Sequence, residues 1–123
     1  MGVGRPAIIE LEPVPLPDTE LVARLFRVLG DATRLRILDV LLEEGELHQM
    51  ELVRRLGTSQ SRVSEHLACL AWCGFIVPAR NEGRRTYYRV ADEQVPELIQ
   101  RGRWFLEDNG AQIACCRIVD RKE

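Results

Sequence analysis

Apolar residues recur three and four positions apart in five stretches of the chain, the spacing that places side chains on one face of a helix. These stretches are residues 18–29, 32–44, 48–56, 59–73 and 92–108. Residues able to cap a helix stand at the first, second and fourth starts: Asp18 or Thr19, Asp31, and Thr58 or Ser59. A glycine follows each of the first four stretches and should end it: Gly30, Gly45, Gly57 and Gly74. The pattern predicts a mainly α-helical chain.

The apolar positions also predict which side chains form the core. The second helix should bury Leu35, Leu38, Leu41 and Leu42. The third should bury Met50 or Leu52, with Val53 and Leu56. His48, at the start of the third helix, is expected to be solvent-exposed.

A helix-turn-helix followed by a hairpin is predicted in the middle of the chain. A short turn containing Gly57 joins the third and fourth helices, which is the helix-turn-helix signature. Two β-prone runs, 75–80 and 85–90, then flank a turn with Asn81 and Gly83. A hairpin in this place, with arginines at its tip, is the wing of a winged helix. We therefore expect a mainly α fold with a β-hairpin wing.

The fourth helix carries different side chains on different faces. Its core stripe is Val63, Leu67 and Leu70. The exposed early turns carry Gln60, Ser61, Arg62 and Ser64. Cys69 and Cys73 lie about 80–120° to one side of the core stripe, together with His66. At a spacing of four residues two helical thiols are close enough to share one metal ion, although free cysteines often act as small apolar core residues.

Charge is distributed unevenly along the chain. Residues 54–90 hold seven arginines against two glutamates, a local charge of +5. Because the whole chain carries −2, the remaining residues carry −7. A basic stripe on an acidic body indicates one face that meets phosphate. Arg84 and Arg85 on the wing should contact phosphate or the minor groove, while Gln60 and Arg62 can read base edges in the major groove and Ser61 and Ser64 suit bases or phosphates.

The ends of the chain differ from its centre. Residues 1–17 contain four prolines and should form an extended arm. We expect Asn109-Gly110 to break the last helix, leaving 109–123 as a tail that holds Cys115 and Cys116. The predicted division is therefore an arm at 1–17, a winged helix-turn-helix domain at 18–108 that binds DNA, and a tail at 109–123. With no secretory signal and no apolar run long enough for a membrane span, the expected location is the cytoplasm, and the four cysteines are not expected to form disulfides.

Three segments resemble the ArsR/SmtB family of metal-responsive repressors. They are 31–38 (DATRLRIL), 59–67 (SQSRVSEHL) and 83–88 (GRRTYY), and the resemblance covers about residues 18–108. It implies a winged helix-turn-helix homodimer, paired through its first and last helices, that represses transcription from double-stranded operator DNA near its own promoter. Metal binding would release the DNA. In that comparison 59–67 is the recognition helix, so His66 joins the candidate DNA contacts, with core packing or metal ligation as its alternatives.

The resemblance also indicates which metal site is present. Residues 47–52 lack the two cysteines of the family's arsenic and cadmium sensors, and 92–108 lack the histidines of its zinc sensors. Residues 66–74 instead resemble the cadmium/lead sensors of the CmtR type, where two recognition-helix cysteines join a third from the C-terminal region of the other subunit. On this resemblance Cys69 and Cys73 are expected to bind metal, completed by Cys115, Cys116 or both. Three soft thiolates favour Cd(II) or Pb(II), with As(III) or Zn(II) as alternatives.

Other function classes remain to be weighed against a metal sensor. A thiol redox sensor could use Cys69 and Cys73, or Cys115 and Cys116. An arsenic-responsive repressor of the same fold fits the same thiolates. An enzyme is not expected, because the sequence has no Cys-x-x-Cys, no positioned general base and no cofactor loop. Accordingly no organic cofactor, small organic substrate or membrane partner is predicted.

Overall fold

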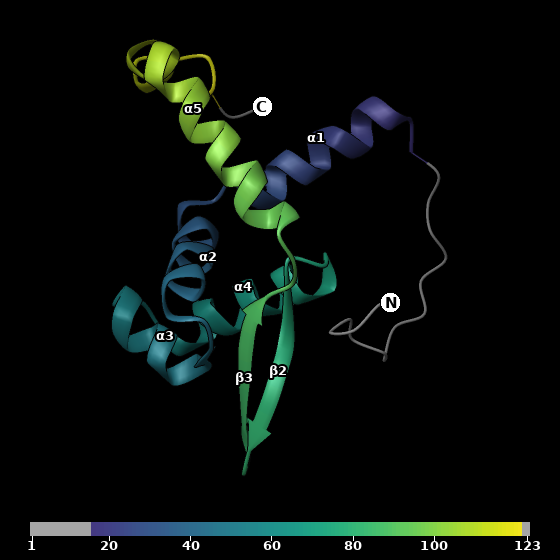
Figure 1. Ribbon diagram of the computed structural model, residues 1–123. Helices are drawn as coiled ribbons and strands as arrows, with labels where there is room; N and C mark the ends of the chain where they lie inside the picture. The colour runs from purple at the N-terminus through teal and green to yellow at the C-terminus, as the bar shows by residue number, and fades with distance from the viewer. Residues whose placement is uncertain (1–15, 122–123) are drawn as a thin grey trace. The chain divides into compact units, whose positions relative to one another are not determined.

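The computed structural model describes residues 16–121, so the predicted arm at 1–17 lies almost wholly outside the described residues. The chain folds into two compact units, and the boundary between them lies after Ala91. Figure 1 shows the helices and strands. In chain order they are α1 (Asp18–Leu29), α2 (Ala32–Glu44), β1 (Leu47–His48), α3 (Gln49–Leu56), α4 (Gln60–Trp72), β2 (Ile76–Glu82), β3 (Arg85–Val90) and α5 (Gln94–Ala114). The predicted order of five helices with a hairpin before the last is confirmed.

The core of the first unit lies where α2, α3, α4 and β2 meet. Its most deeply buried side chains are Ile37, Leu38, Leu41, Leu52, Val63, Leu70 and Ile76. Each such side chain stabilises the fold by about 1.5–3 kcal/mol relative to an exposed position. One predicted core residue misses it, because Leu42 is 39% exposed. Of the two alternatives on α3, Leu52 is the buried one and Met50 is 40% exposed. On α2 the buried stripe runs through Ile37, Leu38 and Leu41, and Leu42 lies about 40° beyond the edge that Leu38 marks.

Two helix starts illustrate different ways of beginning a helix. Ser59 caps α4 as predicted, because its hydroxyl accepts the backbone N–H of Arg62 at 3.2 Å. The predicted cap of α1 by Asp18 or Thr19 is wrong, since Pro17 occupies the N-cap position and no side chain caps this end. Pro17 has its φ already fixed at −56° and its carbonyl accepts the Leu21 N–H at 3.0 Å. Asp18 instead lies in the first turn, where its charge complements the helix dipole.

The turn between α3 and α4 is made possible by one glycine. Gly57 has φ +67° and donates its N–H to Val53 O at 2.9 Å, which ends α3 in a left-handed residue. A side chain at this φ would be strained, so the glycine allows the short connection that brings α3 onto α4. The helix-turn-helix predicted here is confirmed.

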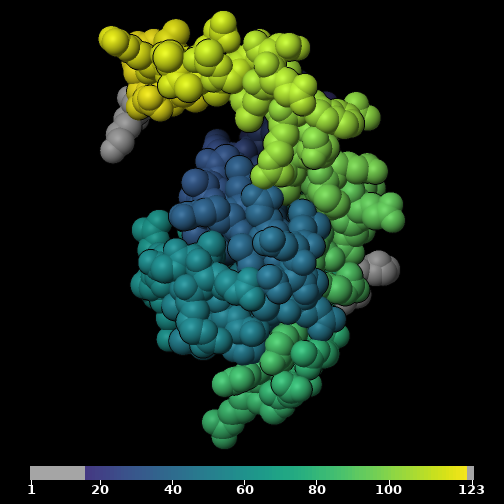
Figure 2. Space-filling model, turned by 60° about the vertical axis from the view of Figure 1, so that its left-hand side comes forward, coloured from purple at the N-terminus to yellow at the C-terminus, as the bar shows by residue number. Residues whose placement is uncertain are grey.

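The wing is a hairpin of β2 and β3 joined at Gly83 and Arg84, with Glu82 opposite Arg85. It projects beyond the body formed by α2, α3 and α4 (Figure 2). The sequence did not indicate β1, a third short strand that pairs with β3 through Leu47 and Tyr88. The sheet order is β1-β3-β2, so the wing is bonded at its base to the segment that precedes α3.

The prediction that His48 is solvated is wrong. His48 is 5% exposed, and its ring stands perpendicular to the Tyr87 ring with 5.1 Å between the centroids. The Glu51 carboxylate accepts the His48 backbone N–H at 3.2 Å. Pairing of β1 with β3 places His48 opposite Tyr87 of the wing. No local pattern around residue 48 could indicate this long-range pairing.

The last helix is longer than predicted. It begins at Gln94, whose N–H is accepted by the Asp92 carboxylate at 2.8 Å, and it continues to Ala114. Asn109-Gly110 does not break it, because Asn109 donates its side-chain amide to Phe105 O at 3.1 Å and Gly110 keeps the helical path. A single helical glycine costs only about 1 kcal/mol, which the neighbouring turns can offset. Within residues 16–121 no helix is both long and apolar enough to cross a membrane.

Removing the cap of α2 should measurably weaken the fold. The Asp31 carboxylate accepts the Arg34 N–H at 3.1 Å, and this hydrogen bond, helped by the charges of His66 and Arg34, lowers the pKa of Asp31 below 3.8. We expect Asp31→Ala to lower the free energy of unfolding by about 1 kcal/mol near neutral pH. Because the folded-state pKa is lowered, the difference should shrink as pH falls below 3.8.

Urea unfolding followed by circular dichroism, near neutral pH and at about pH 3, measures both effects. Glu43→Ala is the matched control, since it removes an exposed carboxylate near the other end of α2, and it should change the free energy by less than about 0.5 kcal/mol. An equal loss in the two variants would contradict the assigned cap.

Candidate DNA interface and thiol site

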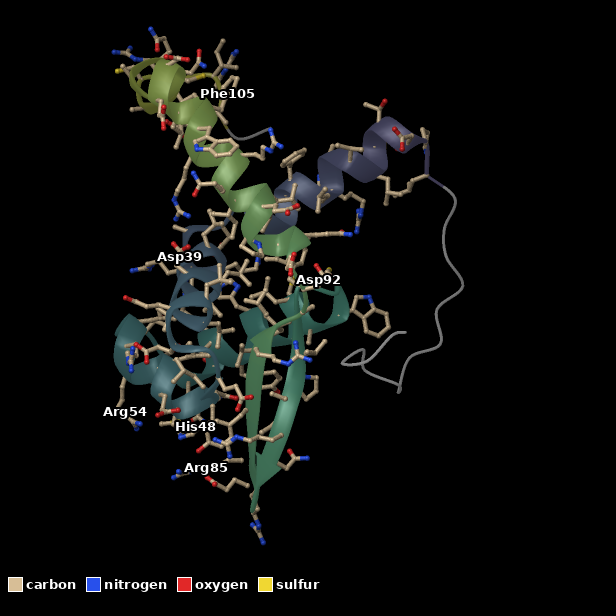
Figure 3. All side chains as sticks on the ribbon, in the orientation of Figure 1. Asp39, His48, Arg54, Arg85, Asp92 and Phe105 are labelled. Atoms are coloured by element: carbon tan, nitrogen blue, oxygen red, sulfur yellow. The ribbon has the colours of Figure 1, made fainter. Side chains whose placement is uncertain are left out.

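The polar residues predicted to meet DNA all lie on the surface. Gln60, Ser61, Arg62 and Ser64 are exposed on the first two turns of α4, and Arg84 and Arg85 are exposed at the tip of the wing. Figure 3 shows Arg85 on the wing, with His48 and Arg54 on the side of α3. Helix and wing therefore present one polar surface from two separate segments of the chain.

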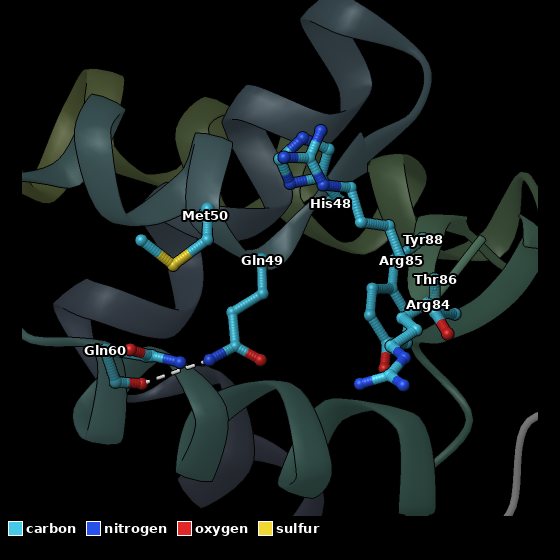
Figure 4. A pocket seen from close by; sticks show the side chains of 8 residues that line it. All are labelled: His48, Gln49, Met50, Gln60, Arg84, Arg85, Thr86 and Tyr88. Carbon is cyan, nitrogen blue, oxygen red and sulfur yellow. Dashed lines mark hydrogen bonds between the residues drawn. The ribbon is translucent and has the colours of Figure 1, made fainter. Parts of the chain in front are cut away.

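A groove of about 240 Å³ lies between these two segments (Figure 4). Its lining is His48, Gln49, Met50, Gln60, Arg84, Arg85, Thr86 and Tyr88. All eight are described residues, and none is acidic. Gln49 joins the walls by donating its side-chain amide to Gln60 O at 3.4 Å. Sequence reasoning missed Gln49, Thr86 and Tyr88, whose place in the groove follows from the pairing of β1 with β3.

An ion-pair and aromatic cluster holds the base of the wing. The Arg80 guanidinium lies 3.8 Å above the Tyr87 ring centre and donates from Nε to Glu46 at 2.9 Å. The Tyr87 hydroxyl donates to Glu82 at 3.1 Å. Glu46 precedes β1, so this cluster joins the hairpin to the body of the unit.

Two of the seven arginines in the basic stripe are neutralised within the protein. Arg80 pairs with Glu46, and Arg55 pairs with Glu44 at 2.8 Å. Both pairs are exposed, where such contacts contribute little stability. The other five arginines of the stripe are exposed on α3 (Arg54), α4 (Arg62), the wing tip (Arg84 and Arg85) and the far part of β3 (Arg89).

His66 is held inside the first unit. Its side chain is 13% exposed, with Nε2 at 3.9 Å from the Asp31 carboxylate and Nδ1 at 3.2 Å from Arg34 Nη1. This is the packing alternative that the sequence allowed. Direct contact of His66 with DNA stays a prediction.

Cys69 and Cys73 form a pair of thiols on one flank of α4. Cys69 is half-buried and Cys73 is exposed as a residue. Burial of its sulfur raises the pKa of Cys73, and Cys69 raises it further through its charge and a hydrogen bond between the side chains. The positive charges of Arg34 and Arg24 act in the opposite direction. A metal that binds Cys73 must therefore displace a proton that this thiol holds more firmly than free cysteine does.

The other two thiols lie beyond the end of α5 in the second unit. Cys115 is exposed and caps the helix, and Cys116 is half-buried. No group of three or more His, Cys, Asp or Glu side chains in residues 16–121 is arranged to hold a metal ion. Each unit thus offers one pair of thiols, and the donor chemistry of both pairs suits a soft cation.

Comparisons with known proteins agree with this architecture. The model of a family described as bacterial regulatory protein, arsR family, matches residues 31–77. A probable mercury resistance operon repressor of Streptomyces lividans is 43% identical over 103 residues, which cover 84% of this chain and 81% of that protein. The HTH-type transcriptional regulator CmtR of Mycobacterium tuberculosis (strain ATCC 25618 / H37Rv) is 45% identical over 83 residues, 64% of this chain and 69% of that protein.

Solved structures give the same fold. The solution structure of a homodimeric winged helix-turn-helix DNA-binding domain, Mb0332 from Mycobacterium bovis, matches with a TM-score of 0.62 at 29% identity, covering 79% of this chain and 92% of that one. The match therefore extends beyond the helix-turn-helix to most of the chain. The protein belongs to the ArsR family of bacterial regulatory proteins and is a winged helix-turn-helix transcriptional regulator rather than an enzyme.

Proposed function

We propose that this regulator is a repressor that binds operator DNA as a homodimer and leaves it when a thiophilic metal binds. Cys69 and Cys73 would supply two thiolates, and Cys115 or Cys116 of the second unit a third. The observation that carries the proposal is the placement of Cys69 and Cys73 four residues apart at the end of α4, the same helix that exposes Gln60, Ser61 and Arg62.

The DNA side of the proposal rests on the surface of α4 and the wing. Arg62 and Gln60 lie on the exposed early turns, where they can enter the major groove and meet guanine or adenine edges. Arg84 and Arg85 extend the contact to the backbone or minor groove, fixing position more than sequence. The groove between them, free of acidic residues among its described lining, favours a polyanion.

Dimerisation is supported by apolar side chains that the fold leaves on the surface. On α1 they are Leu21 (55% exposed) and Phe26 (56%), and on α5 Trp104 (51%) and Phe105 (62%). Aromatic side chains exposed at this level indicate surfaces that become covered in an assembly. A second copy of the chain is the proposed occupant, as in the homodimeric relative from Mycobacterium bovis.

Cd(II) and Pb(II) are the first candidates for the inducer, because three soft thiolates suit them and CmtR is a relative. Hg(II) is a second candidate that two observations favour. A pair of thiols alone satisfies its preference for two sulfur ligands, and the Streptomyces lividans relative is a probable mercury resistance operon repressor. As(III) and thiol oxidation are the remaining alternatives for the same cysteines.

Release of DNA requires that metal and DNA favour different arrangements of the dimer. A metal that joins Cys69 and Cys73 of one subunit to Cys115 or Cys116 of the other subunit would restrict how α4 sits in the dimer. The two recognition helices must match successive major grooves, which lie about 34 Å apart. Any restriction that disturbs this spacing opposes DNA binding, by a coupling that is typically about 1–3 kcal/mol.

The proposal is tested by titrating metals into the protein bound to a fluorescent duplex enriched from a randomised pool. Cd(II), Pb(II), Hg(II) and As(III) are added separately under reductant, and anisotropy reports release. We expect the effective inducer to weaken DNA binding by about 5–150-fold, while ultraviolet absorbance reports sulfur-to-metal charge transfer. If none of the four weakens binding, the proposal fails, and if peroxide alone releases DNA, the cysteines act as a redox sensor.

A further inference from the structure

Arg34 connects three elements of the first unit through one guanidinium group. It lies in the first turn of α2 and is half-buried. Its Nε donates to Val28 O at 2.6 Å and its Nη2 to Arg27 O at 3.2 Å, so it ties down the carboxyl end of α1. Its Nη1 lies 3.2 Å from His66 Nδ1 on α4. One side chain thus links α1 and the recognition helix to α2.

The contact with Arg34 fixes the protonation pattern of His66. An arginine side chain has five N–H donors and no acceptor. His66 Nδ1 must therefore accept from Arg34, and in the neutral ring the proton is carried by Nε2, which faces Asp31 at 3.9 Å. The hydrogen bond is directional, so a rotation or shift of α4 at residue 66 changes it at once.

The thiol pair lies on the same flank of α4 as His66. Cys69 follows His66 by three residues and Cys73 follows Cys69 by four, so the three side chains share one face of the helix. Arg34 and Arg24 of α1 are both close enough to influence the Cys73 thiol electrostatically. The flank that would hold the inducer therefore faces the elements that Arg34 joins.

We infer that Arg34 is the positioning residue through which the thiol pair controls α4 relative to α1, an inference that rests on the proposed function. The side-chain hydrogen bonds of Arg34 go to two carbonyls of α1 and to His66, so Arg34 would act on Cys69 and Cys73 through α4 and not by direct contact. A pull on Cys69 and Cys73 moves the flank of α4, and His66 Nδ1 moves with it. The guanidinium must then release either the imidazole or the α1 carbonyls, and the angle between α1 and α4 changes.

Lysine should not replace Arg34 in this role. Its ammonium is a single point with rotating donors, whereas the guanidinium presents a rigid planar fork that reaches two carbonyls and a ring nitrogen together. Arg34→Lys therefore keeps the positive charge near the thiols and removes the fixed geometry. Arg34→Gln removes both. The matched controls are Arg36→Lys and Arg36→Gln, because Arg36 is exposed two residues further along α2.

The experiment measures the metal-dependent change in DNA affinity for the full chain and each variant, using Cd(II) and the enriched duplex. In the wild type we expect the ratio of dissociation constants with and without metal to be about 5–150. Arg34→Lys and Arg34→Gln should lower this ratio to below about 3 while the charge-transfer band and its stoichiometry stay unchanged. Both Arg36 variants should keep the wild-type ratio. Because the coupling is reciprocal, the factor by which DNA changes the metal affinity should fall in the Arg34 variants as much as the factor by which metal changes the DNA affinity.

His66 provides a second readout that does not depend on a variant that may lose its fold. The chain has two histidines, so His66 is assigned in an imidazole ¹H–¹⁵N spectrum by comparison with His48→Gln. Metal-free protein should show the Nε2–H tautomer at His66. Cd(II) should shift the His66 Nδ1 resonance in the wild type and leave it unshifted in Cys73→Ser.

The outcomes distinguish failure of the role of Arg34 from failure of the proposed function on which it rests. A wild type with no metal response in DNA binding overturns the proposed function and the role of Arg34 with it. A wild type that responds, together with a wild-type ratio in a folded Arg34→Lys, overturns the role of Arg34 alone. If Arg34→Lys does not fold, the wild type alone decides. A His66 Nδ1 resonance that does not shift when metal releases the DNA overturns the role of Arg34.

Discussion

Replacing Cys73 by serine should leave DNA binding intact and abolish the response to metal. Serine keeps the size of the side chain, and position 73 is exposed at the end of α4, so the fold and the DNA-facing first turns should be unaffected. A hydroxyl is a poor ligand for a soft cation. The ratio of DNA dissociation constants with and without Cd(II) should fall from about 5–150 to about 1. Cys69→Ser should behave alike, and anisotropy with the enriched duplex measures both.

The second unit supplies the matched comparison for these variants. Cys115→Ser and Cys116→Ser each remove one of two adjacent thiols at the end of α5. If one of them completes the site, only that variant should lose the charge-transfer intensity of one thiolate and the response to metal. If Hg(II) is the inducer and two thiolates suffice, both variants should respond normally. Release of DNA by metal from Cys73→Ser would refute the assignment of the site.

The pH dependence of metal binding offers an internal check on the same pair. Burial raises the pKa of the Cys73 thiol, and Cys69 raises it further. A metal must displace that proton, so its apparent affinity should rise with pH until the thiol ionises without it. If the thiols had lowered pKa values, they would already be ionised near neutrality, and the metal affinity would not change with pH there.

The residues of α4 show how much the sequence could predict. Val63, Leu67 and Leu70 are buried and Gln60 to Arg62 exposed, as their spacing indicated. Helical periodicity is a local property that depends on neighbours three and four residues away, so it could be predicted from the sequence alone. The same holds for the cap at Ser59 and the turn at Gly57.

Errors arose where distant segments decide the outcome. His48 is buried because β1 pairs with β3, which lies about forty residues further along the chain. The sequence did not indicate a role for Arg34, because its partners are the end of α1 and a histidine thirty-two residues away. The Asn109-Gly110 prediction failed for another reason, since a weak local preference against helix was taken as decisive. Long-range pairing and small competing energies are what sequence patterns do not contain.

Arg62→Ala should weaken DNA binding about 5–150-fold and relax the preference for sequence. Arg62 is exposed in the first turn of α4, where a bidentate contact to a guanine edge contributes about 1–3 kcal/mol of discrimination. Arg84→Ala and Arg85→Ala, at the wing tip, should instead weaken all sequences equally. Each variant removes about one phosphate contact per subunit. The slope of log affinity against log salt should therefore fall by about 1 for each subunit that contacts the DNA.

Arg55→Ala is the control that makes this distinction sharp. Arg55 belongs to the same basic stripe, but its guanidinium donates to Glu44 at 2.8 Å. Because Arg55→Ala alone would leave the Glu44 carboxylate without this partner, it is combined with Glu44→Ala, and loss of the neutral pair should change neither the affinity nor the salt slope. Anisotropy titrations at several salt concentrations, against the enriched duplex and a scrambled one, separate the two kinds of contact. A salt slope reduced by Arg62→Ala with sequence preference intact would mean that Arg62 contacts phosphate. The reading of bases would then fall to Gln60, Ser61 and Ser64, which share its exposed face of α4.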